Sequence, residues 1–249
     1  MIIEERDPES KEVFFNCIET ETGDIIFKNF QLEERFWIGI EKIFKGIIIF
    51  HKYEKPDLPR HKGIISFDIE AKKILWENAD LIFLFVHNEN LFCYRDSFDG
   101  RLFYKLEIRT GNVIEELGSS VGEINKLREN ITNEDEYMKY RFPEIYLNEK
   151  NDENINKIVQ DLKNDCVITG PVEIVNYSGL LLISYFEVIN NGLLNNIFRV
   201  FALNDGKLIF KEKLNSLTKT IIPDTFFIID NLVFLLINKV KLVVCEIKK

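Results

Sequence analysis

The chain carries three histidines, and two of them are spaced so that they could bind a metal ion. His51 and His61 flank the polar segment YEKPDLPR, in which Asp57 offers a third ligand. Two imidazoles and a carboxylate are a donor set that zinc uses in proteins. However, this spacing matches no recognised ligand motif, and His87 stands apart at the end of a strand-like run. We therefore expect exposed loop histidines and no metal site.

The acidic residues and possible nucleophiles give no stronger indication of chemistry. Asp96 and Asp99 precede Gly100 in YRDSFDGRL and loosely resemble a calcium loop, but the D-x-D-x-D-G spacing is absent. Asp-Gly between two strand-like runs is typical of a hairpin turn. The sequence contains neither G-x-S-x-G nor a glycine-rich phosphate loop. It therefore identifies no catalytic residue and no cofactor.

Composition and charge narrow the class of partner. The 249 residues are 46% hydrophobic and 29% charged, with a formal net charge of −9. The chain lacks the clustered Lys and Arg that phosphate binding needs. Nucleic acid and anionic membranes are therefore excluded as first choices of partner, and a protein partner is favoured. The start, MIIEERDPES, lacks a signal peptide, and the longest apolar runs are far shorter than the ~20 residues that span a bilayer. Four widely spaced cysteines indicate free thiols and a cytoplasmic location.

One segment combines charge with aromatic side chains. The strand pattern stops after Leu117, and NEDEYMKYRFPEIYLNEKND then follows within the interruption. The candidate binding residues in this segment are Tyr137, Tyr140, Phe142 and Tyr146. Binding residues often lie on loops that a rigid scaffold holds in place. The alternative is that these aromatics pack the segment onto the rest of the protein.

Two helices are predicted on either side of the aromatic segment. Ser120 and Glu123 have the S-x-x-E spacing of a capping box, and apolar residues follow at helical spacing, which predicts a helix over 121–130. In DENINKIVQDLKND the apolar residues recur at i, i+3, i+4 and i+7, so a second helix is predicted, with Asn151 or Asp152 as its cap. Together they define a helical insertion near residues 118–165.

The rest of the chain is a series of strand pairs joined by a repeated turn. Four aligned segments read IETETGDIIF (18–27), FDIEAKKILW (67–76), LEIRTGNVIE (106–115) and FALNDGKLIF (201–210). The turn position holds Gly23, Lys72, Gly111 and Gly206, and the fourth residue after it is Phe27, Trp76, Glu115 and Phe210. Glycine supplies the positive φ that such turns require. The turns recur about every 40–50 residues, with one gap twice as long, which is the spacing of propeller blades.

The repeat resembles the tryptophan-docking motif of PQQ-like propellers, whose consensus runs A-x-D-x-x-T-G-x-x-x-W. Glu107, Thr110 and Gly111 stand in its acid, Thr and Gly positions, and Trp76 stands in its docking position. The departures are Lys72, Ala202 and Glu115. The resemblance implies a propeller fold, but it covers only the repeat segments and transfers no active site and no quinone cofactor. The chain is also similar to an uncharacterised group of small bacterial propellers.

We therefore predict an all-β fold, a β-propeller of about five four-stranded blades within a range of four to six. Residues 1–249 form a single domain, with 118–165 inserted between blades. The C-terminal runs DTFFIID, LVFLLIN and KLVVCEIK supply three strands of the last blade. We expect an N-terminal strand, from VFFNCIE or DIIFKNF, to add the fourth and close the ring.

Three functions are compatible with this fold, because the fold alone does not choose among them. The first is a non-enzymatic protein-interaction or scaffold propeller that recognises its partner through loops and the aromatic insertion. The second is an enzyme, a hydrolase or lyase, with a polar site at the mouth of the channel. The third is a sensor of a small ligand. The lack of any catalytic motif favours the first, and the sequence leaves the oligomeric state open.

Overall fold

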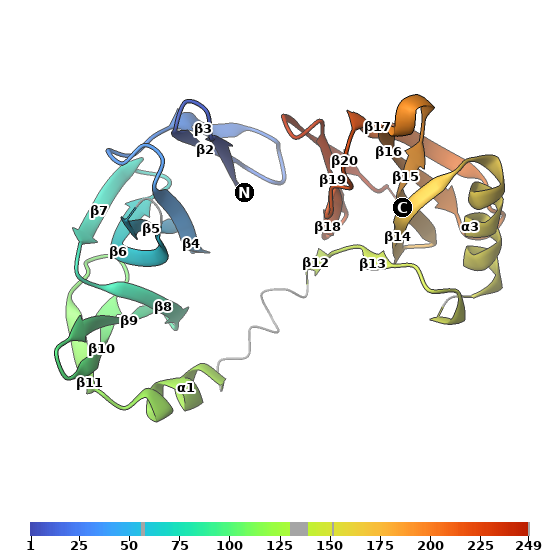
Figure 1. Ribbon diagram of the computed structural model, residues 1–249. Helices are drawn as coiled ribbons and strands as arrows, with labels where there is room; N and C mark the ends of the chain where they lie inside the picture. Colours follow the sequence, from blue (N-terminus) through green and yellow to red (C-terminus); the bar gives the residue numbers. More distant parts are fainter. Residues whose placement is uncertain (56–57, 130–138, 151, 249) are drawn as a thin grey trace. The chain divides into compact units, whose positions relative to one another are not determined.

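The computed structural model describes residues 1–55, 58–129, 139–150 and 152–248 (Figure 1). The chain divides into two compact units, Met1–Thr132 and Asn133–Lys249. Antiparallel strands make up most of each unit, and the two helices of the described residues lie between β11 and β14 in the chain. Neither helix has the length and the apolar character that crossing a membrane requires.

The first unit consists of three antiparallel sheets that follow one another along the chain. The first sheet contains β1 (Ile2–Asp7), β2 (Glu12–Ile18) and β3 (Ile25–Phe30). The second contains β4 (Ile38–Phe44), β5 (Ile47–Lys55), β6 (Leu58–Asp68) and β7 (Lys73–Asn78). The third contains β8 (Ile82–His87), β9 (Asn90–Ser97), β10 (Gly100–Glu107) and β11 (Val113–Gly118). In each sheet the strands are neighbours in chain order, as they are in a propeller blade.

The second unit contains two further antiparallel sheets. The fourth sheet is formed by β13 (Glu144–Ile145), β14 (Ile168–Tyr177), β15 (Leu180–Val188), β16 (Leu194–Ala202) and β17 (Leu208–Thr218). The last sheet is formed by β12 (Tyr140–Arg141), β18 (Phe226–Ile229), β19 (Leu232–Ile237) and β20 (Lys241–Glu246). Two short 3-10 helices, η1 (Asn148–Lys150) and η2 (Asn190–Gly192), lie in the connections.

The fourth strand of the last sheet does not come from the N-terminus, and that prediction is wrong. VFFNCIE and DIIFKNF form β2 and β3 in the first sheet, where β2 also pairs with β1 from Ile2↔Cys17 to Asp7↔Glu12. Because the start of the chain is charged, its sequence pattern did not predict that β1 is a strand. The missing strand is β12, which pairs with β18 and comes from the insertion.

The core of the first unit lies between its sheets. Along β5, Ile48 and Phe50 point into a cluster with residues of the first sheet, such as Phe15. The alternate residues Ile47 and Ile49 point into a second cluster, with residues of the third sheet. All four of these β5 side chains are buried, because a strand with sheets on both faces must be apolar on both. The second sheet is therefore packed on both sides, like a blade between its neighbours.

The repeated turns share one backbone conformation. Gly23, Gly111 and Gly206 have φ values of +77°, +71° and +69°, and Lys72 has φ +53° at the same position. In the second and third copies, the acidic residue at the start of the segment caps the turn. Asp68 accepts a hydrogen bond from the Ala71 N–H (2.8 Å), and Glu107 likewise binds the N–H groups of its own turn. The acid position thus satisfies backbone donors that the tight turn leaves unpaired.

The aromatic positions of the repeat differ in what they contact. Trp76 packs across to the third sheet, where its indole N–H donates to the carbonyl of Ile108 (2.9 Å). Phe27 of the first sheet lies edge-on to Phe67 of the second (5.9 Å between ring centroids). Phe210 is partly exposed and reaches Phe198 of its own sheet, and Glu115 pairs with Lys105 of its own sheet. Only the first two contacts therefore join neighbouring sheets.

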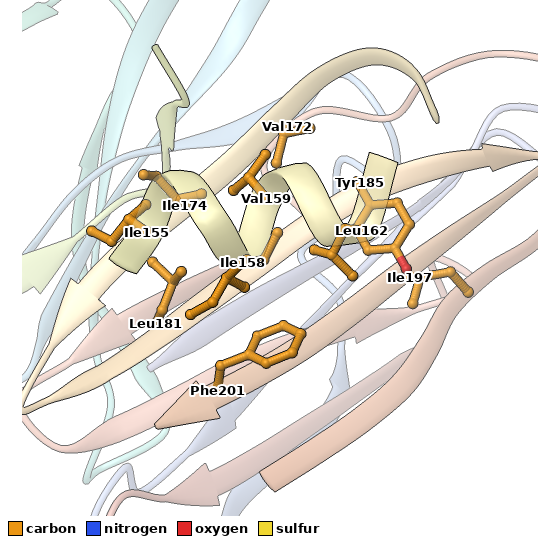
Figure 2. Close-up of a cluster of buried hydrophobic side chains, with 11 residues drawn as sticks. Ile155, Ile158, Val159, Leu162, Val172, Ile174, Leu181, Tyr185, Ile197 and Phe201 are labelled. Atoms are coloured by element: carbon orange, nitrogen blue, oxygen red, sulfur yellow. The ribbon is translucent and has the colours of Figure 1, made fainter. Parts of the chain in front are cut away.

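The two predicted helices are present. Helix α1 (Val121–Glu129) packs its Ile124 against Tyr94 and Phe103 of the third sheet. Helix α3 (Glu153–Asp165) starts at Asp152, whose carboxylate accepts from the N–H of Ile155 (2.9 Å). Its apolar stripe packs on the face of the fourth sheet that carries Leu181, Ile183 and Tyr185 (Figure 2). The stripe consists of Ile155, Ile158, Val159 and Leu162.

Each helix of the insertion therefore covers one face of a sheet. The other face of the fourth sheet packs against the last sheet through Leu182, Phe198 and Phe226. The predicted fold class, an all-β β-propeller of about five four-stranded blades with a helical insertion near residues 118–165, agrees with these five sheets and two helices. The single-domain organisation over residues 1–249 stays a prediction.

Candidate functional site

The aromatic segment of the insertion is built into the sheets of the second unit. β12 pairs with β18, and only two residues later β13 pairs with β14 of the other sheet. Pro143 lies between them, and because it has no N–H and a fixed φ it suits a position where one ladder ends and the next begins. The segment is thus an edge strand of both sheets, which fixes the direction of its side chains.

Much of the apolar surface of this segment faces solvent. Tyr140 and Phe142 are 41% and 54% exposed, and Ile145 and Leu147 are 62% and 44% exposed. The Tyr140 and Phe142 rings stack (6.2 Å between centroids, 8° between planes), and Phe142 also contacts Phe227 of β18 (6.1 Å). We call Tyr140, Phe142, Ile145 and Leu147 the apolar strip.

A hollow of about 700 Å³ adjoins the apolar strip. Ile145 and Tyr146 line one side, and Lys163, Cys166 and Val167 line another, where α3 ends and β14 begins. Val167 is itself 70% exposed, so apolar surface continues across the hollow. Burial raises the pKa of the Cys166 thiol, which therefore stays protonated at neutral pH and is not an activated nucleophile.

The four aromatics predicted to bind are not alike in the structure. Tyr140 and Phe142 lie in the apolar strip, whereas Tyr137 lies outside the described residues. Tyr146 packs against the cluster under α3, and its hydroxyl is 2.8 Å from Asn156 Oδ1 and 2.9 Å from Asn148 Oδ1. These contacts suit a residue that holds the segment against α3.

The second candidate site is a cluster of Glu41, His51 and His61 on three neighbouring strands, β4, β5 and β6. One atom from each residue can be chosen so that all three lie within 4.8 Å of one another. His61 Nδ1 and Glu41 Oε1 are hydrogen-bonded at 2.7 Å. The two imidazole rings are stacked, with centroids 3.5 Å apart and planes inclined by 9°. The predicted pair of loop histidines is therefore a pair of strand residues. Among the described residues the carboxylate beside them is that of Glu41, and the predicted third ligand, Asp57, lies outside the described residues.

His51 is the most constrained member of the cluster. It is 3% exposed, which corrects the expectation of a solvent-exposed histidine. Its Nδ1 lies 3.2 Å from Glu41 Oε1, and its Nε2 has no hydrogen-bond partner among the residues that the structure describes. A Cβ on Gly39 would lie 2.8 Å from His51 Cε1, so glycine at position 39 leaves the space that the ring fills.

Glu41 reaches the histidines because of a β-bulge. The β4–β5 register shifts between Ile40 and Lys42, so Glu41 is the extra residue, and bulges commonly redirect a side chain in this way. Burial by itself raises the pKa of the Glu41 carboxyl, but His51 and His61 favour the charged form by more, and the pKa lies below its ordinary value. The cluster therefore presents an ionised carboxylate at neutral pH.

The remaining sequence candidates have structural explanations. Asp99 and Gly100 belong to the β9–β10 hairpin turn, as predicted, and Asp96 forms ion pairs with Arg60 and Arg101. The four cysteines are free. His87, the third histidine, is hydrogen-bonded through Nε2 to the side chain of Asn88 (2.8 Å).

Sequence reasoning missed Glu41, Gly39, Ile145 and Leu147. The first two lie in an ordinary strand, FWIGIEKIF, where a bulge leaves no sign in the alternation of apolar residues. Ile145 and Leu147 were hidden among the aromatics, although their spacing of two residues in an extended segment was a usable signal.

The five meandering antiparallel sheets define the chain as an all-β protein of blade-type sheets. A family model described as "Domain of unknown function (DUF4905)" matches residues 1–76, which contain the first sheet and most of the second. The comparison with curated proteins finds no match.

Similar solved structures include three whose TM-scores are between 0.25 and 0.31. The dihydro-heme d1 dehydrogenase NirN in complex with DHE is 12% identical, with 84% of this chain and 37% of that chain covered and a TM-score of 0.25. Hsv2 of Kluyveromyces lactis is 12% identical, with 99% and 74% covered and a TM-score of 0.25. The Dos1 propeller is 9% identical, with 95% and 61% covered and a TM-score of 0.31. The chain thus spans little more than a third of the NirN chain.

Proposed function

We propose that this chain is a non-enzymatic protein-interaction module that binds a partner protein through the apolar strip of the insertion. The observation that carries the proposal is that four large apolar side chains are exposed within eight residues of a segment fixed to two sheets. Single exposed apolar residues are ordinary, but several in one short segment, one of them lining a hollow, are typical of a contact surface.

The chemistry of the surface indicates the kind of partner. A hollow of about 700 Å³ next to Ile145 and Val167 is large enough to accept several side chains of a partner. The formal net charge of −9 favours a partner with a basic surface, because opposite charges raise the rate of encounter. The partner that fits best is therefore a basic protein with an apolar side chain at the centre of its contact surface.

The test compares two positions that carry an exposed phenylalanine, 142 and 98. A photo-crosslinking amino acid is placed at position 142, in the strip, or at position 98, at the tip of the β9–β10 hairpin, where Phe98 is fully exposed. We expect position 142 to form a covalent adduct with one partner protein in the native cell extract and position 98 to form none with that partner. The double variant Phe142→Ser, Ile145→Ser should then bind the purified partner at least tenfold more weakly.

Phe98→Ser is the control for that binding measurement, because it removes a phenylalanine of the other unit that is even more exposed than Phe142. It should leave the affinity unchanged. Equal adducts at positions 98 and 142, or equal affinity of the wild type and the double variant, would contradict a role of the strip in recognition. Thermal unfolding of each variant confirms that the comparison is between folded proteins.

Three further features of the protein are part of this proposal. We propose that the repeats are degenerate members of the PQQ-like type, supported by the contact of Trp76 with Ile108 and by the acid-capped turns at Asp68 and Glu107. We also propose that both units act as one domain. The four free cysteines support a cytoplasmic location.

A further inference from the structure

We propose that Glu41, His51 and His61 form a binding site for a divalent transition-metal ion, with Zn²⁺ as the best fit. The site lies in the first unit and goes beyond the proposed protein interaction. Three potential ligand atoms from three neighbouring strands already lie within 4.8 Å of one another. Side chains on strands are held more firmly than side chains on loops, so the three residues are already close together before the metal arrives.

The strongest indication is the state of His51. A buried imidazole places two polar nitrogens away from water, and a buried polar atom left without a partner is destabilising. His51 is 3% exposed; its Nδ1 lies 3.2 Å from Glu41 Oε1, and its Nε2 has no hydrogen-bond partner among the described residues. Gly39 leaves the space for its ring, and the ring of Tyr53 lies edge-on to it at 5.0 Å. The protein thus holds an unpaired nitrogen donor beside an acidic side chain, and a bound metal ion would supply the partner.

The donor set selects the class of ion. Two imidazole nitrogens and one carboxylate oxygen suit Zn²⁺ and other divalent transition metals, whereas Ca²⁺ and Mg²⁺ prefer oxygen ligands alone. Glu41 supplies the carboxylate oxygen, which lies 2.7 Å from His61 Nδ1 and 3.2 Å from His51 Nδ1. Three protein ligands leave a fourth position of a tetrahedral ion for water. The Glu41 side chain is 14% exposed and that of His61 is 41% exposed, so the site has an open side through which the ion can enter.

Binding requires one change in the cluster. A metal ion lies close to the plane of each imidazole that binds it, so two parallel rings 3.5 Å apart cannot both coordinate the same ion. Ligands of a tetrahedral zinc ion also lie about 3.3 Å apart, farther than the 2.7 Å between Glu41 Oε1 and His61 Nδ1. The half-exposed His61 is the residue with room to turn, whereas the ring of His51 is confined. We therefore expect zinc to unstack the rings by rotating His61.

The experiment titrates full-length protein with Zn²⁺ after treatment with a chelator, using calorimetry. We expect the wild type to bind one ion per chain. His61→Ala and Glu41→Gln should each weaken binding by at least about tenfold, because even residues that only support a metal ligand contribute that much. Both substitutions are at positions with some solvent exposure and Glu41→Gln keeps the shape of the side chain, so neither should prevent folding. His87→Ala is the matched control, since His87 lies outside the cluster, and it should bind like the wild type.

Two spectroscopic measurements identify the ligands. With Co²⁺ in place of Zn²⁺, we expect the visible bands of a tetrahedral site without the near-ultraviolet band of thiolate coordination. In NMR spectra of the imidazole nitrogens, the signals of His51 and His61 should shift on zinc binding and that of His87 should not. The proposal is overturned if the wild type binds no zinc, if His61→Ala and Glu41→Gln bind as tightly as the wild type, or if a thiolate band appears. None of these outcomes depends on whether the apolar strip binds a protein.

Discussion

Trp76 and Gly111 lie on neighbouring sheets, and the indole ring occupies the space that a side chain at position 111 would need. A Cβ on Gly111 would be 2.6 Å from Cδ2 of Trp76. Glycine at this turn therefore meets two requirements, a φ of +71° and room for the ring. The same residue shapes the turn and accepts the contact that joins the second sheet to the third.

The two requirements can be separated by comparing equivalent glycines. Gly23 has φ +77° at the same position of the first copy, but a Cβ added there would meet none of the described residues within 4 Å. Gly23→Ala should lower the free energy of unfolding by about 1–2 kcal/mol through backbone strain alone. Gly111→Ala should cost about 2–4 kcal/mol, because Trp76 must also move. Urea unfolding followed by circular dichroism measures both, and equal losses would mean that the Trp76 contact adds nothing.

The Trp76 side chain itself should carry a large part of the joint between the two sheets. Trp76→Ala is expected to lower the free energy of unfolding by about 3 kcal/mol, since it leaves a gap above Gly111 and removes one of two donors to the Ile108 carbonyl, the other being the Ser66 hydroxyl. Trp76→Phe keeps a ring but loses the N–H donor, so the expected loss is about half as large. Chemical unfolding measures both variants. A loss below about 1 kcal/mol for Trp76→Ala would remove the basis for a docking role.

Glu115 stands where the other copies of the repeat have an aromatic residue. In the copy that follows it, a side chain of helix α3 lies beside the turn. At Gly206, the nearest side-chain atom to an added Cβ would be Ile158 Cγ1 of α3, at 3.8 Å. The helix thus lies over the turn of the fourth copy, where Trp76 lies over the turn of the third. Glu115, in the copy before the insertion, is exposed and pairs with Lys105. The sequence alone shows this exception, because an acidic residue replaces the aromatic one in the copy that directly precedes the helical insertion.

Most of the fold followed from periodicity and turn residues, since both are local properties. The apolar stripe of α3 and the doubly buried strand β5 each appear in the order of residues alone. Strand pairing between distant segments did not follow in the same way. The two residues of β12 are too few for any alternation, and their partner β18 is more than 80 positions away, so nothing local specifies the pairing.

In the candidate sites, too, the sequence identified some residues and missed others. Tyr140 and Phe142 were identifiable because aromatics in a charged segment are unusual. The cluster around His51 was not, because Glu41 comes from a bulge and Gly39 matters only through the ring that fills its space. Bulges and close contacts depend on the neighbouring strand, and a single sequence does not specify them.

Lys72 offers a way to stabilise the protein. It has φ +53° in the turn where the other copies have glycine, and it is exposed. Lys72→Gly should raise the free energy of unfolding by up to about 1 kcal/mol, as the left-handed strain is partly offset by the greater freedom of glycine in the unfolded chain. Lys73→Gly, one residue later in β7, should instead destabilise by about 0.5–1 kcal/mol. Thermal and urea unfolding of the two variants provide the measurement, and a loss of stability in Lys72→Gly would contradict the strain at this turn.

Asp68 should make part of the stability depend on pH. The N–H of Ala71 is the main cause that lowers the pKa of the Asp68 carboxyl, and the Arg109 guanidinium, 3.2 Å away in the turn of the third sheet, lowers it further. Because the folded pKa is below the unfolded one, the unfolded chain takes up a proton first as the solution is acidified. The contribution of Asp68 is therefore complete above the unfolded value of about 3.9 and is lost as the pH falls through the folded value.

Asp68→Asn removes this titration but keeps an oxygen that can accept from Ala71. We expect the variant to be less stable than the wild type at pH 7 and the difference in stability to shrink below about pH 4. Below that pH the wild type loses the stabilisation from its ionised carboxylate, which the variant lacks at every pH. Urea midpoints measured from pH 7 downward test this. Glu70→Gln removes one negative charge from an exposed neighbour and should run parallel to the wild type. A curve for Asp68→Asn that also runs parallel would show that the carboxylate is not linked to folding.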